Sequence, residues 1–92
     1  MLRVLKVEIG SHRQDALTTL EVGQTYASEY TGDGISPLPN CFVVGSFSQS
    51  ESSGKPYWLM RFSGMGITGT ALLSELSELV TDSKLSLKLA GQ

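Results

Sequence analysis

The fold of this chain is decided by one segment, Tyr57-Trp58-Leu59-Met60-Arg61-Phe62-Ser63-Gly64-Met65-Gly66-Ile67-Thr68-Gly69, in which a strand-like run leads into a glycine-rich turn. Trp58, Met60 and Phe62 fall on alternate positions, which is the spacing of a strand with one face in the core. In residues 70–82, leucines and one valine recur at i, i+1, i+4, i+7 and i+8 from Leu72, as on the apolar face of a helix. This order predicts a sheet packed against one amphipathic helix.

The remaining segments add strands to this unit. Alternating or continuous apolar runs predict four further strands, at residues 2–9, 25–30, 41–47 and 84–89. We expect the last of these strands to lie beside the first strand or beside residues 56–62. The sequence therefore predicts an α+β fold in a single domain spanning 1–92, with an antiparallel sheet of four to five strands packed on the helix of residues 70–82.

Three segments are predicted to connect these elements. Residues 11–20 carry both helix and strand signals, and we favour a short helix or turn there. Residues 31–40 contain glycines, prolines, an aspartate and an asparagine, a composition typical of a loop. Residues 48–54 are rich in serine, which favours a flexible hairpin tip between the strands on either side.

Composition limits the chemistry that the chain can perform. The 92 residues carry a formal net charge of −2, which argues against broad nucleic-acid binding because such binding needs many cations. The chain has one histidine and one cysteine, Cys41, so we expect no metal site and no internal disulfide. A lone cysteine between a turn and an apolar run is most often a small core residue, and we expect Cys41 to be buried.

The glycine segment matches a nucleotide-binding pattern, because Gly64, Gly66 and Gly69 spell G-x-G-x-x-G between a predicted strand and a predicted helix. A dinucleotide site also needs an acidic residue about 20 positions further on, and residues 89–92 contain none. We therefore interpret the glycines as a sharp turn from sheet to helix. The alternative is a site where backbone amides at the helix start bind a phosphate or carboxylate. Its candidate residues are Gly66, Thr68, Gly69 and Thr70.

Tyrosines and cations are the candidate partner-binding residues, because tyrosine and arginine are enriched at binding hot spots. The candidates are Tyr57, Arg61, Lys55, Tyr26 and Tyr30. The three tyrosines would form an aromatic platform for bases or a peptide if they shared a face, but we favour packing in the core with the hydroxyls at its rim. A second candidate patch joins the cations of the first and last strands, on the condition that these strands are neighbours. Its members are Arg3, Lys6, Lys84 and Lys88.

These observations favour a small non-enzymatic binding protein that occupies the surface of a protein or ribonucleoprotein partner, with local RNA phosphate contacts as an option. Proteins of this size and type are common among bacteriophage and mobile-element products that inhibit host machinery, including CRISPR effector complexes. We expect no cofactor, no metal and no membrane partner, and a cytoplasmic location because no signal peptide or apolar run of about 18 residues is visible. The alternatives are a nucleic-acid-contacting module and a nucleotide-binding sensor or enzyme that uses the Gly64–Gly69 turn.

Overall fold

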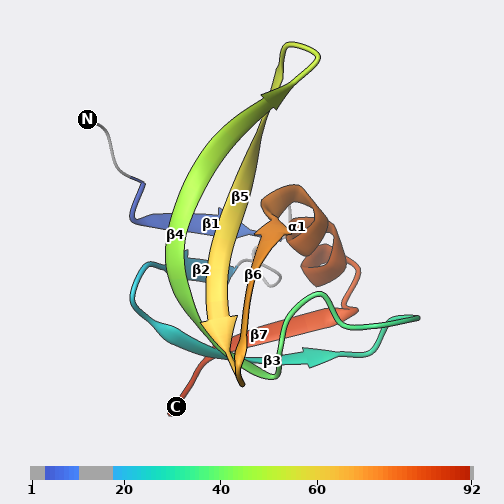
Figure 1. The fold of residues 1–92 in the computed structure, drawn as a ribbon. Helices are drawn as coiled ribbons and strands as arrows, with labels where there is room; N and C mark the ends of the chain where they lie inside the picture. The colour runs from blue at the N-terminus through green and yellow to red at the C-terminus, as the bar shows by residue number, and fades with distance from the viewer. Residues whose placement is uncertain (1–3, 11–17, 92) are drawn as a thin grey trace.

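The structure is a computed structural model that describes residues 4–10 and 18–91, and Figure 1 shows its fold. The elements, in chain order, are β1 Lys6–Ile9, β2 Thr18–Glu21, β3 Thr25–Tyr30, β4 Cys41–Ser52, β5 Lys55–Gly64, β6 Ile67–Leu72, α1 Leu73–Thr81 and β7 Leu85–Leu89. A five-stranded sheet has the order β6-β5-β4-β3-β7, and β1 and β2 form a separate two-stranded sheet. All strand pairs are antiparallel, so the predicted α+β class with one helix is confirmed.

The central feature is the long hairpin of β4 and β5. Its turn consists of Ser53 and Gly54, which have φ angles of 52° and 78°. Positive φ at both central residues is the requirement of a type I′ turn, whose twist matches that of the flanking strands. The pairing extends from Val43↔Ser63 to Ser52↔Lys55, so the flexible tip predicted for residues 48–54 is wrong.

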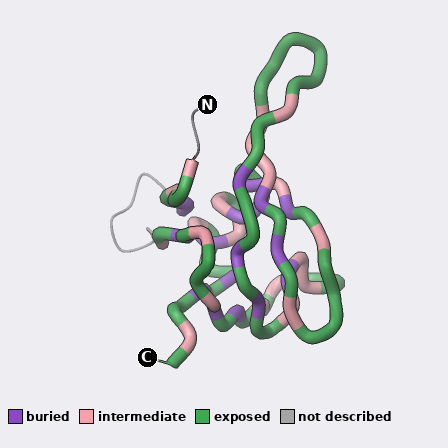
Figure 2. The backbone as a smooth tube through the Cα atoms, turned by 60° about the vertical axis from the view of Figure 1, so that its left-hand side comes forward, coloured by how far each residue is buried: buried purple, intermediate pink, exposed green. Residues whose placement is uncertain are grey.

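The core lies on one face of the five-stranded sheet. The Phe42 ring packs between the rings of Tyr26 and Phe62, at centroid distances of 5.9 Å and 6.0 Å. Met60 and Leu76 are fully buried beside them, and α1 contacts β1, β5, β6 and β7. Figure 2 shows the buried residues along the strands, whereas the end of the β4–β5 hairpin is exposed.

The helix begins later than the sequence predicts. Residues 70–72 belong to β6, and α1 runs from Leu73 to Thr81 with Leu72 as N-cap and no side-chain cap. The apolar face of α1 is as predicted, because Leu73, Leu76 and Val80 are buried. The boundary moves because β6 pairs along its whole length with β5, from Gly64↔Ile67 to Leu59↔Leu72. This cross-strand pairing overrides the helical spacing of the leucines.

Two local predictions in the first half of the chain are also wrong. Residues 18–20 belong to strand β2, not to a helix or turn, because Thr18–Glu21 pairs with β1, whereas residues 11–17 lie outside the described residues. Cys41 is exposed rather than buried, since β4 alternates there and directs Phe42 and Val44 into the core.

The last strand has a neighbour that the sequence does not indicate. β7 pairs with β3, from Tyr26↔Leu89 to Tyr30↔Leu85, and not with β1 or β5. Thr31 N–H extends this pairing by donating a hydrogen bond to Lys84 O at 2.8 Å. Strand β3 is therefore held between β4 and β7 in the interior of the sheet.

Candidate functional site

The β4–β5 hairpin extends beyond the rest of the molecule (Figure 1). β3 pairs with β4 only up to Val43, and β6 pairs with β5 only from Leu59 onward. Residues 48–58 therefore form a two-stranded arm with no third strand among the described residues, and we call this segment the hairpin arm. Most of its side chains are exposed. The arm is therefore accessible to another molecule.

Side chains of the β4–β5 hairpin form two rows on one face of the sheet, in the arm and in the part of the hairpin next to it. Successive residues of a strand point to opposite faces, so the β5 residues that alternate with the buried Met60 and Phe62 share the outer face. These residues are Lys55, Tyr57, Leu59 and Arg61. The register places a serine beside each of them on β4, in the pairs Ser52↔Lys55, Ser50↔Tyr57, Ser48↔Leu59 and Ser46↔Arg61. We call these two rows together the outer face.

The outer face continues onto β6. Leu72 pairs with Leu59, and Thr70 pairs with Arg61. Tyr57, Leu59 and Leu72 are half-buried, whereas Arg61 and Thr70 are exposed. The outer face therefore combines an apolar centre with small hydroxyl side chains and two cations, Lys55 and Arg61.

Three of the five predicted partner-binding residues thus share one face, whereas Tyr26 and Tyr30 follow the favoured prediction of core packing and not the alternative of an aromatic platform. Tyr26 is 4% exposed, and its hydroxyl accepts a hydrogen bond from Glu21 N–H at 2.8 Å. Tyr30 lies on the same inner side of β3, and its hydroxyl donates to Asp33 O at 2.7 Å. Both tyrosines are directed toward the core side of the sheet, whereas Tyr57 is on the opposite side. Tyr26 and Tyr30 stabilise the fold and its loop, and they do not join Tyr57.

The glycine segment also has a different setting from the predicted one. Met65 and Gly66 form a hairpin turn between β5 and β6, with φ angles of 51° and 80°. Thr68, Gly69 and Thr70 lie within β6, so their amides are not at the start of the helix. The strand–turn–helix setting that the anion site and the nucleotide site both require is therefore contradicted.

Two of the glycines are needed for close packing. A Cβ atom on Gly64 would lie 2.1 Å from Cys41 O and 2.8 Å from Phe42 Cα, both backbone atoms. A Cβ atom on Gly69 would lie 2.9 Å from the Phe62 ring, which covers this position from the neighbouring strand. The G-x-G-x-x-G spacing thus arises from one turn and two close approaches between strands.

The predicted cation patch does not form. Lys6 lies on β1 of the two-stranded sheet, whereas Lys84 precedes β7 and Lys88 lies on it, and β7 pairs with β3. Arg3 lies outside the described residues. The first and last strands are therefore not neighbours, which was the condition for this patch.

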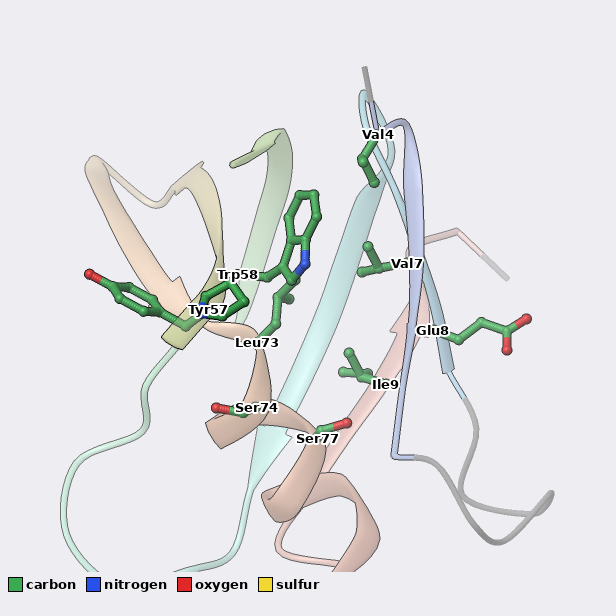
Figure 3. A pocket seen from close by; sticks show the side chains of 10 residues that line it. Val4, Val7, Glu8, Ile9, Tyr57, Trp58, Leu73, Ser74 and Ser77 are labelled. Carbon is green, nitrogen blue, oxygen red and sulfur yellow. The ribbon is translucent and has the colours of Figure 1, made fainter. Parts of the chain in front are cut away.

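Sequence reasoning missed a hollow between the two sheets (Figure 3). Its volume is about 450 Å³, and β1, β5 and the start of α1 line it. Its residues are Val4, Val7, Glu8, Ile9, Pro56, Tyr57, Trp58, Leu73, Ser74 and Ser77. Gly10 N–H donates a hydrogen bond to Ser77 Oγ at 2.7 Å and ties the end of β1 to the helix. The hollow has no local sequence signal, because it depends on the packing of β1 against a strand and a helix that are distant in the sequence.

Residues 4–10 and 18–91 contain no group of three or more metal-ligating side chains. In the same residues, every buried side-chain nitrogen or oxygen has a hydrogen-bond partner. No helix in the described part of the chain is long and apolar enough to cross a membrane. Comparison with protein-family models, with curated proteins and with solved structures gives no match.

Proposed function

We propose that this protein is a small non-enzymatic binding protein that occupies the surface of a macromolecular partner with its outer face and hairpin arm. The observation that carries the proposal is the pair of parallel rows on β4 and β5, in which half-buried Tyr57 and exposed Arg61 lie beside a continuous row of serines. The rows stand on a hairpin that reaches beyond the body of the molecule (Figure 1).

The chemistry of the two rows suits protein recognition. Tyrosine contributes a large contact area at low conformational cost, and serine contributes adaptable hydrogen bonds, which is the combination found in antibody binding loops. Arginine adds a planar group that forms paired hydrogen bonds with carboxylates. Because serines take the place of further charged residues, the face presents little charge to be desolvated when a partner covers it.

The arm itself supports the same proposal. A two-stranded hairpin without further packing is only marginally stable in water. Residues 48–58 have this form, and a partner that packs on the outer face of the arm would bury Tyr57 together with the serine row. The contact would thus add to the stability of the arm as well as to binding.

Within this class, we propose the inhibitor type that is common among bacteriophage and mobile-element proteins, acting in the cytoplasm on host machinery such as a CRISPR effector complex. A protein that inhibits by occupying a surface acts stoichiometrically. Titration into an effector cleavage assay should therefore abolish activity near one protein per complex. Inactivation of many complexes by one molecule would contradict a non-enzymatic mechanism.

The test of the surface is the double variant Tyr57→Ala/Arg61→Ala. After a tagged protein has been used to isolate its partner from the native host, affinities are measured with the purified pair. Two hot-spot residues together are expected to weaken binding by about a thousandfold, because each contributes roughly 2 kcal/mol. The matched control is Glu75→Ala/Glu78→Ala, which alters two exposed residues on α1. Unchanged affinity of a folded Tyr57/Arg61 variant would refute the proposed surface.

A further inference from the structure

The hollow between the two sheets runs along the edges of two strands. It touches three consecutive residues of β1, from Val7 to Ile9, and three consecutive residues of β5, from Pro56 to Trp58. Consecutive residues of a strand point to opposite faces, and Figure 3 shows the side chains of Glu8 and Tyr57 directed away from the hollow, so these two residues border it with their backbone. The hollow therefore reaches the strand edges as well as the inner faces. The floor is formed by the first turns of α1, at Leu73, Ser74 and Ser77.

Neither of these edges carries a strand in the part of the chain that the structure describes. β1 pairs with β2 alone, on its other edge. Residues 56–58 of β5 pair with β4, but the pairing of β5 with β6 begins only at Leu59. Pro56 has no backbone N–H, so the β5 edge is less suited to pairing with another strand. β1 contains no proline. An unpaired edge of this kind is a template for a further strand.

We propose that the free edge of β1 accepts an extended peptide segment of a partner protein, which adds a strand to the two-stranded sheet and fills the hollow against Trp58 and Leu73. A volume of about 450 Å³ lies within the range of known ligand sites. β1 has four residues, and a paired segment of that length spans about 13 Å. Main-chain hydrogen bonds supply affinity in this mode of recognition, and alternate side chains supply specificity.

The side chains around β1 define the sequence of the bound segment. Figure 3 shows Val7 and Ile9 directed into the hollow and Glu8 directed to the opposite side of β1. Residues of the added strand that lie beside Val7 and Ile9 face the apolar side chains of Trp58 and Leu73, so they are apolar. The residue that lies beside Glu8 faces outward, and opposite charges on neighbouring strands attract, so it is basic. The segment therefore has the alternation apolar, lysine or arginine, apolar.

This site goes beyond the proposed function, because it lies on the core side of β5 and does not use the outer face. The Arg61→Ala variant, which alters the outer face alone, is expected to bind the peptide as the natural chain does, since Arg61 does not line the hollow. Failure of one site therefore leaves the other unaffected, and the two outcomes are distinguishable.

The experiment uses Trp58 as its reporter, because the chain has one tryptophan and this residue lines the hollow. The probes are acetyl-Ser-Val-Lys-Val-Ser-amide and its charge-reversed form with glutamate in place of lysine. The lysine peptide should change Trp58 emission saturably with a Kd of about 1 mM or tighter, and should bind about fivefold more tightly than the glutamate peptide. Glu8→Lys should reverse this preference, whereas the control Glu75→Lys should keep it.

Strand pairing has its own signature, which an apolar contact lacks. N-methylation of the probe's alternate amides that face β1 should abolish binding, and N-methylation of the other alternate set should be tolerated. Absence of saturable binding by the lysine peptide, or a preference that Glu8→Lys leaves unchanged, would overturn the proposal. Equal binding of both charge forms and of all N-methylated forms would show that the hollow takes apolar groups without strand addition, and would also overturn it.

Discussion

Gly64 is the position where a single methyl group should have the largest effect on this fold. A Cβ atom added there would approach backbone atoms of β4, at 2.1 Å from Cys41 O and 2.8 Å from Phe42 Cα. An ordinary contact needs about 3.5 Å, so β4 and β5 would have to separate by more than about 1 Å. No side-chain rotation relieves such a contact. The change would also move Phe42 away from Phe62, whose rings are 6.0 Å apart.

The expected cost of Gly64→Ala is about 2–4 kcal/mol in the free energy of unfolding, as for other overpacked sites. The chain entropy that alanine removes from the unfolded state opposes this by less than about 1 kcal/mol. A 92-residue domain has about 5–14 kcal/mol in total, so the variant should still fold but melt roughly 10–30 °C lower. Circular dichroism during thermal and urea unfolding measures both quantities.

Gly34→Ala is the matched control. Gly34 has a φ of 80°, and a Cβ atom added to it would have no atom within 4 Å, so the change costs only backbone strain of about 1 kcal/mol. If Gly64→Ala were as stable as the natural chain, the close approach of β4 and β5 would be refuted.

Two further predictions concern the hairpin arm and the tether of β1. Ser53 has a φ of 52°, which asparagine tolerates better than serine does, so Ser53→Asn should stabilise the chain by about 0.5 kcal/mol in urea unfolding; a loss of stability would contradict the type I′ turn. Ser77→Ala removes the acceptor of the buried Gly10 N–H and should cost about 1 kcal/mol, with faster amide exchange at Gly10 and along β1. Ser74→Ala, an exposed change one turn earlier on α1, should leave that exchange unaltered, and equal effects of the two variants would argue against the tether.

The sequence predicts elements well where one local pattern dominates. Residues 25–30 alternate, and β3 has these bounds. The leucine stripe predicts a helix, and Leu73, Leu76 and Val80 are the buried residues of α1. Residues 67–72 carry conflicting signals, since Ile67 and the threonines favour a strand whereas Leu72 and Leu73 continue the helical spacing. Pairing with β5 decides between them, and that pairing is a tertiary contact that the local sequence does not specify.

The amino-acid composition of residues 48–52 makes the serine row hard to predict from the sequence. Ser48-Gln49-Ser50-Glu51-Ser52 resembles a flexible tip because serine and glycine are common in loops. The same residues alternate with period two, and Ser53-Gly54 supplies the positive φ angles of a two-residue turn. The spacing of the serines and the position of the turn thus indicate a paired hairpin, whereas the amino-acid types alone indicate a loop. The neighbour of β7 is hidden for a different reason, because strand order depends on contacts across the whole chain.

The tyrosines show how far the alternation of side chains along a strand can predict a binding surface. This alternation indicates which residues of one strand share a face. The indication is correct for Lys55, Tyr57 and Arg61 on β5 and for Tyr26 and Tyr30 on β3. It does not state whether two strands direct these faces to the same side of the sheet. On β3 the choice follows from the alternate residues, since Ala27 and Glu29 bury less apolar area than two tyrosine rings do. On β5, Trp58 and Met60 compete for the core more strongly than Tyr57 does, so Tyr57 is left outside. The outer face thus consists of side chains that are left out of the core. Tyr57 is the one large aromatic residue among them, and it stays available to a partner.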